Sequence, residues 1–133
     1  MASCAWGPTT SQIITVSDMN VRMTVWSLND KSVQFIRNPK YDTNKGMVFS
    51  GNGRLMALIE KNEETGRDIV GLYDTTGNNW ECLHHLNVDM FDIENMTFSG
   101  EGTHLIIWDS PLKCKLLVYQ IIFGPNNTIQ ACQ

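Results

Sequence analysis

The sequence predicts an all-β fold in which four-stranded antiparallel sheets repeat along the chain and pack face to face. Three observations predict it. Two segments, VFSGNGRLMALIE at 48–60 and TFSGEGTHLIIWD at 97–109, are nearly the same. Aromatic residues recur roughly every 45 residues, a period typical of repeat architectures. The apolar segments between the turns are short, as β-strands are.

Two independent sets of aromatic residues mark the repeat. One aromatic residue lies beside each predicted first turn, with spacings of 43 and 49 residues: Trp6, Phe49 and Phe98. A second lies in a later apolar segment, with spacings of 47 and 46 residues: Trp26, Tyr73 and Tyr119. Because the two sets repeat in step, we expect three copies of one structural unit.

Short apolar runs bounded by turn residues predict the strands of each unit. The expected ranges are 13–16, 23–28 and 32–37 in the first unit, 55–59, 70–75 and 80–86 in the second, and 105–108 and 116–121 in the third. The segments 51–53 and 100–102 begin and end in glycine, which tolerates positive φ, so both are predicted to be tight hairpin turns. No segment shows sustained helical periodicity.

The predicted strands are apolar on both faces, as in LMALI, LIIW and KLLVY. A sheet with one wet face would alternate apolar and polar residues, so these sheets should be covered on both sides. Four-stranded sheets stacked in this way at a period of roughly 40–45 residues are typical of β-propeller blades. We expect one domain over 1–133, with blades at about 1–37, about 46–87 and about 93–133.

Three blades are too few for a closed propeller, which needs at least about four. The prediction is therefore an incomplete propeller with an apolar blade face open at each end. Such a chain should be an open arc, be marginally stable, self-associate through these faces, or be completed by another chain.

Composition excludes several function classes. The chain has 133 residues, enough for an ordinary core, with 18% charged residues and a net charge of −4. No basic stripe is present to neutralise phosphates, so a nucleic-acid partner is not expected. No apolar run reaches the roughly 18 residues of a membrane helix, and the first residues lack a signal-peptide pattern. Four scattered cysteines without such a signal indicate reduced thiols and a cytoplasmic protein.

No catalytic, cofactor or metal site is expected. Cys82, His84 and His85 do not have a recognised ligand spacing, and adjacent strand residues point to opposite faces. No nucleophile elbow surrounds Ser50, and the segment 51–53 lacks the lysine and helix of a phosphate loop. The serine belongs to the repeated turn, which explains it structurally.

Three segments are the candidate partner-binding sites, because loops on a rigid scaffold carry most of the function. The loop 61–68 contains Arg67 and is highly charged. The alternative to a binding role is that it is only a solvated hairpin tip. The loop 87–94 places Met90 and Phe91 between acids; the alternative is a Phe91 folded back into the blade. Trp108 and Asp109 lie at a strand end, where Trp108 is either an interface anchor or a core residue.

The segment SDMNVRMTVWSL at 17–28 resembles the WD-repeat family, with Asp18 at its turn aspartate and Trp26 at its strand tryptophan. In that family each repeat ends in a Trp-Asp dipeptide. Here the aspartate is kept in Tyr73-Asp74 but not in Trp26-Ser27 or Tyr119-Gln120. The literal pair Trp108-Asp109 ends an earlier strand, so it does not mark the end of a repeat.

Longer stretches resemble a centrosomal and spindle-pole branch of that family, namely 2–8, 21–40, 53–60 and 105–120. The likeness covers about 2–120, and the tail departs from it. The resemblance implies a non-enzymatic scaffold without cofactor that anchors microtubule ends, with a coiled-coil anchoring protein as partner. The alternative is a truncated propeller with a purely structural role, which needs further blades or another chain to function.

Overall fold

Three four-stranded sheets make up the described part of the chain, and no helix occurs in it. The computed structural model describes residues 3–7, 12–16, 22–28, 31, 33–37, 39–40, 46–50, 53–62, 64–75, 80–88, 90, 92–99, 102–109, 115–123 and 129–132. Within these ranges the predicted all-β class and the four-stranded units are confirmed.

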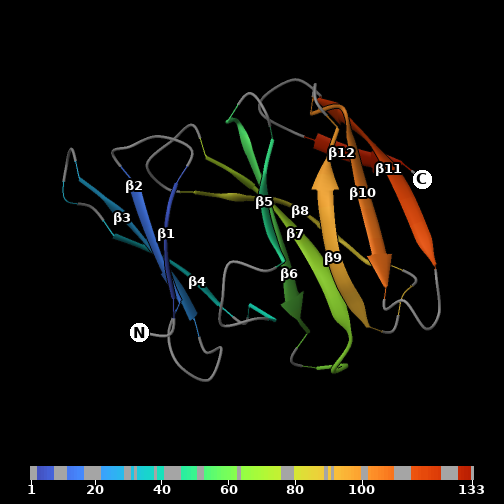
Figure 1. The fold of residues 1–133 in the computed structure, drawn as a ribbon, viewed down its shortest axis with the longest axis horizontal. Helices are drawn as coiled ribbons and strands as arrows, with labels where there is room; N and C mark the ends of the chain where they lie inside the picture. The colour runs from blue at the N-terminus through green and yellow to red at the C-terminus, as the bar shows by residue number, and fades with distance from the viewer. Residues whose placement is uncertain are drawn as a thin grey trace.

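Every sheet follows chain order and is antiparallel throughout. Sheet I contains β1 (Ser3–Trp6), β2 (Gln12–Val16), β3 (Arg22–Ser27) and β4 (Val33–Arg37). Sheet II contains β5 (Met47–Phe49), β6 (Leu55–Lys61), β7 (Asp68–Asp74) and β8 (Cys82–Leu86). Sheet III contains β9 (Ile93–Phe98), β10 (His104–Asp109), β11 (Leu116–Phe123) and β12 (Ile129–Cys132). The sheets lie one after another, from blue to red (Figure 1).

The repeated motif is a turn with one hydrogen-bond pattern in both copies. In sheet II the Ser50 hydroxyl accepts from the backbone N–H of Leu55 at 3.1 Å, and the Gly53 N–H donates to the Ser50 carbonyl at 2.9 Å. In sheet III the equivalent bonds join His104 and Gly102 to Ser99 at 3.1 and 2.9 Å. Gly53 and Gly102 have φ of 72° and 76°, which confirms that glycine is needed in these turns.

Sheet II is dry on both faces, as predicted. Along β6, alternate side chains enter different cores. Leu55, Ala57 and Ile59 pack with residues of sheet III, whereas Met56 and Leu58 pack with residues of sheet I. Each of these five side chains is at most 3% exposed. The continuous apolar run of β6 therefore reflects burial between two neighbouring sheets.

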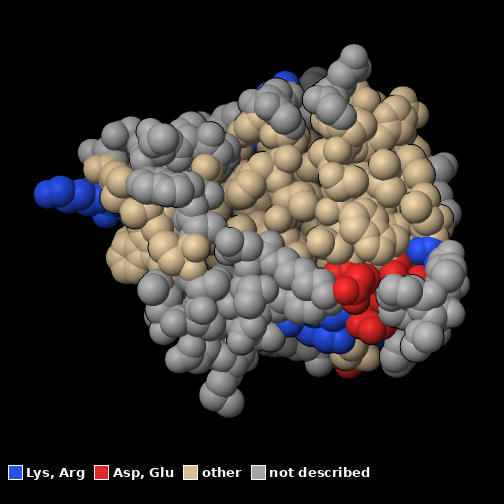
Figure 2. All heavy atoms as spheres, in the orientation of Figure 1, with Lys and Arg blue, Asp and Glu red and all other residues tan. Residues whose placement is uncertain are grey.

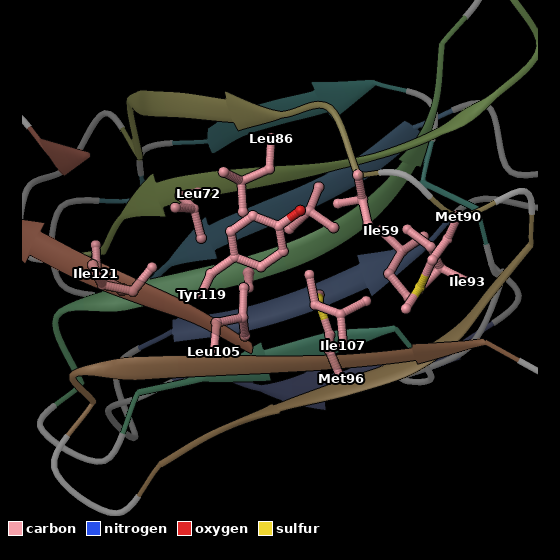
Figure 3. Close-up of a cluster of buried hydrophobic side chains, with 14 of the residues drawn as sticks. Ile59, Leu72, Leu86, Met90, Ile93, Met96, Leu105, Ile107, Tyr119 and Ile121 are labelled. Carbon is pink, nitrogen blue, oxygen red and sulfur yellow. The ribbon is translucent and has the colours of Figure 1, made fainter. Parts of the chain in front are cut away.

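The core between sheets II and III is the larger of the two apolar cores. Residues from both sheets converge on the Tyr119 ring, which is buried among aliphatic side chains (Figure 3). The labelled side chains of this core come from sheet II, the segment that follows it, and sheet III: Ile59, Leu72, Leu86, Met90, Ile93, Met96, Leu105, Ile107 and Ile121.

The core between sheets I and II is smaller and contains aromatic residues. Ile14, Met23, Val25 and Ile36 of sheet I meet Met56, Leu58, Tyr73 and Trp80. The Phe49 and Trp80 rings lie edge to face, with centroids 6.2 Å apart. This geometry is favourable for aromatic pairs and fixes the tryptophan beside sheet II.

The two end sheets leave one apolar face uncovered, as expected for an incomplete propeller. The exposed large apolar residues belong to these sheets or border them: Trp26, Leu28 and Phe35 at sheet I, and Leu116, Val118 and Ile122 on sheet III. Sheet II contributes none among its described residues.

Candidate partner-binding surface

A buried carboxylate at the end of sheet II organises the loops predicted to bind partners. The side chain of Asp68, the first residue of β7, has no exposed surface. Lys40 Nζ lies 2.6 Å from its Oδ2, and Lys61 Nζ lies 2.7 Å from its Oδ1. The backbone N–H of Ile93 donates to Oδ2 at 2.9 Å. Asp68 therefore joins the loop end of sheet II to the start of sheet III.

Lys40 extends this contact to the segment between sheets I and II. Its backbone N–H donates to the Ile59 carbonyl at 2.8 Å, and its Nζ donates to the Ile93 carbonyl at 2.7 Å and to Asp92. Burial by itself would raise the pKa of Asp68. The contacts with Lys40, Lys61 and the Ile93 amide outweigh it, so the pKa lies below the usual range and the carboxylate stays ionised.

The two predicted loops share one cavity beside this carboxylate. It has a volume of about 320 Å³, and the residues that line it come from the β6–β7 hairpin and from the segment after β8: Asn62, Thr65, Arg67, Asp68, Ile69, Asn87 and Val88. Figure 2 shows acidic and basic side chains gathered near the end of β6 and the start of β9, next to a mainly uncharged surface.

The hairpin that carries Arg67 is held by its own hydrogen bonds. The Asn62 N–H donates to the Arg67 carbonyl at 2.8 Å, and the Gly66 N–H donates to the Asn62 carbonyl at 2.8 Å. The Asn62 side-chain oxygen accepts from the Glu64 N–H at 2.9 Å. Gly66 has φ of 70°, which a side chain would disfavour. The exposed Arg67 side chain thus stands on an ordered turn at the rim of the cavity.

Met90 is not available as an anchor in this structure. The sequence suggested an exposed apolar pair with Phe91, but the Met90 side chain is 2% exposed and belongs to the core between sheets II and III. The turn at its backbone, where the Met90 N–H donates to Val88 O at 2.8 Å, directs the side chain inward. Phe91 lies outside the described residues.

Trp108 and Asp109 do not line the cavity. Trp108 is half-buried and pairs with Leu116 across β10 and β11, on the uncovered face of sheet III. Asp109 is buried, and its Oδ1 accepts from the Lys115 N–H at 2.9 Å. Its carboxylate therefore closes the β10–β11 connection, and the structure does not expose it to a partner.

The residues matched to the WD pattern have different environments. Trp26 is 45% exposed, and its Nε1–H donates to Thr15 Oγ1 at 3.0 Å. Tyr73 and Tyr119 occupy the equivalent position in the next sheets and are buried. Asp74 is half-buried and pairs through its backbone with Glu81, whereas Asp18 lies outside the described residues.

Sequence reasoning missed a buried carboxyl between sheets I and II. Glu60 is 7% exposed and accepts a 2.8 Å hydrogen bond from the Tyr73 hydroxyl. Burial raises the pKa of Glu60 to about 7, although the Tyr73 bond lowers it in part. Gly71 leaves room for this carboxyl, since a Cβ there would lie 2.0 Å from Glu60 Oε2. A glycine inside an apolar strand was the available signal of this close approach.

Asp68 and Lys40 had no comparable signal, because 28 residues separate them and neither belongs to a motif. In the histidine segment, His85 Nε2 lies 3.6 Å from both Glu60 Oε2 and Cys82 Sγ. Burial, and secondarily Glu60, raises the pKa of the Cys82 thiol. In the part of the chain that the structure describes, no group of three or more His, Cys, Asp or Glu residues could hold a metal ion, and no helix could cross a membrane.

Two curated proteins are similar to most of this chain. It is 34% identical over 121 residues to the WD repeat-containing protein WRAP73 of Mus musculus, covering 91% of this chain and 25% of that protein. It is 21% identical over 136 residues to an uncharacterized WD repeat-containing protein of Schizosaccharomyces pombe, covering 98% of this chain and 28% of that protein. The chain thus spans about a quarter of the length of these relatives. No family model matches it.

Solved structures support the fold. A putative 6-phosphogluconolactonase from Bacteroides uniformis matches with a TM-score of 0.60 and 11% identity, over 98% of this chain and 38% of that one. TolB from Acinetobacter baumannii matches with a TM-score of 0.54 and 19% identity, over 97% of this chain and 31% of that one. The β-propeller domain of the Trilobed protease from Pyrococcus furiosus matches with a TM-score of 0.51 and 14% identity, over 90% of this chain and 36% of that one.

These likenesses support the WD-repeat propeller interpretation, and the three sheets have the architecture of part of a propeller. At these identities the structural matches inform about fold alone. The lactonase name describes that protein, and the residues discussed above include no arrangement that transfers its chemistry to this chain.

Proposed function

We propose that the chain is a non-enzymatic protein-interaction scaffold whose binding surface is the cavity between the β6–β7 hairpin and the segment after β8. Its WD-repeat relatives support a scaffold role in general terms. The observation that supports this location of the binding surface is the buried Asp68, which holds two loops distant in sequence against one another. Because the loops are ordered before binding, a partner loses little affinity to loop ordering.

The cavity suits a protruding peptide side chain. Its volume of about 320 Å³ is at the lower end of ligand pockets, which start at roughly 300 Å³. Asn62, Thr65 and Asn87 offer neutral hydrogen-bonding groups at its wall, and Arg67 offers an exposed guanidinium. Arginine is frequent among the residues that dominate interface energetics. We expect the partner to place an acidic or amide side chain against Arg67.

The finer proposal is a centrosomal or spindle-pole role in the cytoplasm. It is supported by the resemblance of 21–40, 53–60 and 105–120 to WD repeat-containing protein eight, a centrosome and spindle-pole component. The 34% identity to a mouse WD-repeat protein over most of the chain is compatible with it. The partner of this proposal is a coiled-coil protein that anchors microtubule ends.

Affinity capture with matched arginine variants tests both the proposed binding surface and the proposed cellular role. Arg67→Glu should reduce recovery of a coiled-coil centrosomal protein about tenfold or more, the loss typical of an interface arginine. Arg54→Glu is the control, because Arg54 is also exposed but lies at the other end of β6. Equal recovery by the two variants would place the binding surface elsewhere. Recovery of no centrosomal protein by the folded wild type would refute the cellular role.

A further inference from the structure

The backbone of the buried Glu60 lies beside the contact that Asp68 makes with two lysines. Lys61, the next residue and the last of β6, has its Nζ 2.7 Å from Asp68 Oδ1. The Lys40 backbone N–H donates to the carbonyl of the residue before Glu60 at 2.8 Å, and Pro39 forms a β-bridge with Glu60 itself. Both lysines that contact Asp68 are therefore positioned by the backbone around Glu60.

The Glu60 side chain points to the opposite face of sheet II. Successive strand residues alternate, so the side chains of Glu60 and Lys61 point in opposite directions. Glu60 lies on the side of Tyr73, which belongs to the core between sheets I and II. Gly71, two residues before Tyr73, provides the space that the carboxyl occupies. At 7% exposure the carboxyl has lost most of its contact with water, and such burial disfavours the charged form.

Within the described residues, three titratable side chains of sheet II face Glu60. The Tyr73 hydroxyl of β7 donates to Oε2 at 2.8 Å. His85 of β8 has its Nε2 3.6 Å from Oε2, beyond a hydrogen bond, and is charged only when protonated. Burial, and then the nearby Glu60, raises the pKa of the Cys82 thiol of β8. Sheet I contributes apolar side chains to this core, and both lysine ammonium groups lie on Asp68. In the part of the chain that the structure describes, no permanent cation therefore offsets a negative charge on Glu60.

We propose that Glu60 is a pH-sensitive switch that controls the order of the binding surface. With a protonated Glu60 the end of β6 stays closed, and Lys40 and Lys61 remain on Asp68. An ionised Glu60 moves outward to water, and the backbone that moves with it releases the two lysines. The consequence for a partner rests on the proposed function: because ordered loops preserve affinity, binding should weaken as the pH rises. The opening itself is a property of the chain alone.

The sign and the size of the effect follow from proton binding. The pKa of Glu60 is about 7 in the closed form, because burial disfavours the charge, and in an open form exposed to water it returns to 4.5. The open form releases its proton at lower pH than the closed form does. The open population therefore rises with pH between these two values and is constant above them. From pH 5.5 to pH 8.5 the expected increase is about thirtyfold.

Amide hydrogen exchange of the chain without a partner tests the switch. The backbone N–H groups of Lys40, Asn62 and Ile93 are the reporters, because their hydrogen bonds hold the loops of the binding surface. Corrected for the intrinsic exchange rate, their protection should fall at least about tenfold from pH 5.5 to pH 8.5. The N–H groups of Ser50 and Ser99 are internal controls, since they close turns at the other ends of β6 and β9. Their protection should change less than about twofold, because separate regions open locally and independently.

Matched glutamine variants complete the test. Glu60→Gln keeps the shape but cannot ionise, so its reporter amides should be protected equally at both pH values. Glu64→Gln is the control, because Glu64 is exposed on the hairpin, and this variant should respond as the wild type does. No response in the wild type, equal losses at the reporters and the serine controls, or a Glu60→Gln response like that of the wild type would each overturn the proposal. Equal partner recovery by Arg67→Glu and its control would refute the binding surface and leave the exchange result unchanged, so the two failures are distinguishable.

Discussion

The buried Glu60 predicts an unusual dependence of stability on pH. Its pKa is raised from 4.5 to about 7 in the folded chain because burial disfavours the charged form. Between these two values the folded chain keeps a proton that the unfolded chain releases. The free energy of unfolding therefore falls as pH rises from about 4.5 to about 7, and this contribution is constant above that. The sign is opposite to that of an ion-paired carboxylate.

The magnitude follows from the size of the shift. A pKa change of one unit corresponds to about 1.4 kcal/mol, so this shift corresponds to a total of about 3 kcal/mol. Since Glu60 is only 7% exposed, solvent screening reduces the value little. Between pH 5.5 and 8.5 the wild type should lose about 2 kcal/mol of this total, because part of it is already lost at the lower pH.

Glu60→Gln removes the titration and keeps the shape. The amide oxygen can still accept from the Tyr73 hydroxyl, as the carboxyl does at 2.8 Å. The variant should lack the wild-type loss, and its advantage in unfolding free energy should grow to about 3 kcal/mol at pH 8.5. Urea unfolding followed by tryptophan fluorescence at several pH values measures the difference.

Groups that do not contact residue 60 are the same in both proteins, so their effects cancel in this comparison. Asp68 loses its contribution only as pH falls through its lowered pKa, outside this range. Parallel stability curves for the wild type and Glu60→Gln from pH 5.5 to 8.5 would refute the reasoning and show that the Glu60 carboxyl ionises normally in the fold.

Two substitutions test the packing around the buried carboxyls. Asp68→Ala should lower the free energy of unfolding by about 3 kcal/mol at pH 7, because it removes the buried counter-ion of the nearly buried Lys40 and leaves it only the exposed Asp92; a loss below about 1 kcal/mol in urea melts would mean that the contact between the loops is not structural. In the same assay Gly71→Ala should cost more than about 2 kcal/mol, because its Cβ would lie 2.0 Å from Glu60 Oε2. The control is Gly66→Ala, which meets no atom within 4 Å and has only the cost of its positive φ, about 1 kcal/mol; equal costs at Gly66 and Gly71 would contradict the steric argument.

Local signals predicted the fold well. The apolar run at Leu55–Ile59 indicated a strand covered on both faces, and its residues divide between two cores. The repeated turns required glycine with positive φ, which Gly53 and Gly102 show. Such features depend on a few neighbouring residues, so the sequence displays them directly. The strands β1, β5, β9 and β12 had no predicted range. In β12, for example, the IQAC segment is short and half polar.

The candidate site was only partly predictable. The charged loop was found from composition, and Arg67 lines the cavity. Met90 was misassigned because acidic neighbours suggested exposure, whereas the backbone turn after β8 places the side chain in the core. The contact of Asp68 with Lys40 and Ile93 depends on how three segments meet in space, so no local pattern reports it.

Gly102 also determines how closely sheets II and III can pack at one end. A Cβ at Gly102 would lie 3.3 Å from the Cβ of Ser50, so the two repeated turns nearly touch. A larger side chain would spread sheets II and III at this end only and tilt one against the other. The tilt between successive sheets fixes how many are needed for a full revolution. A single missing methyl group thus contributes to the curvature of the whole arc.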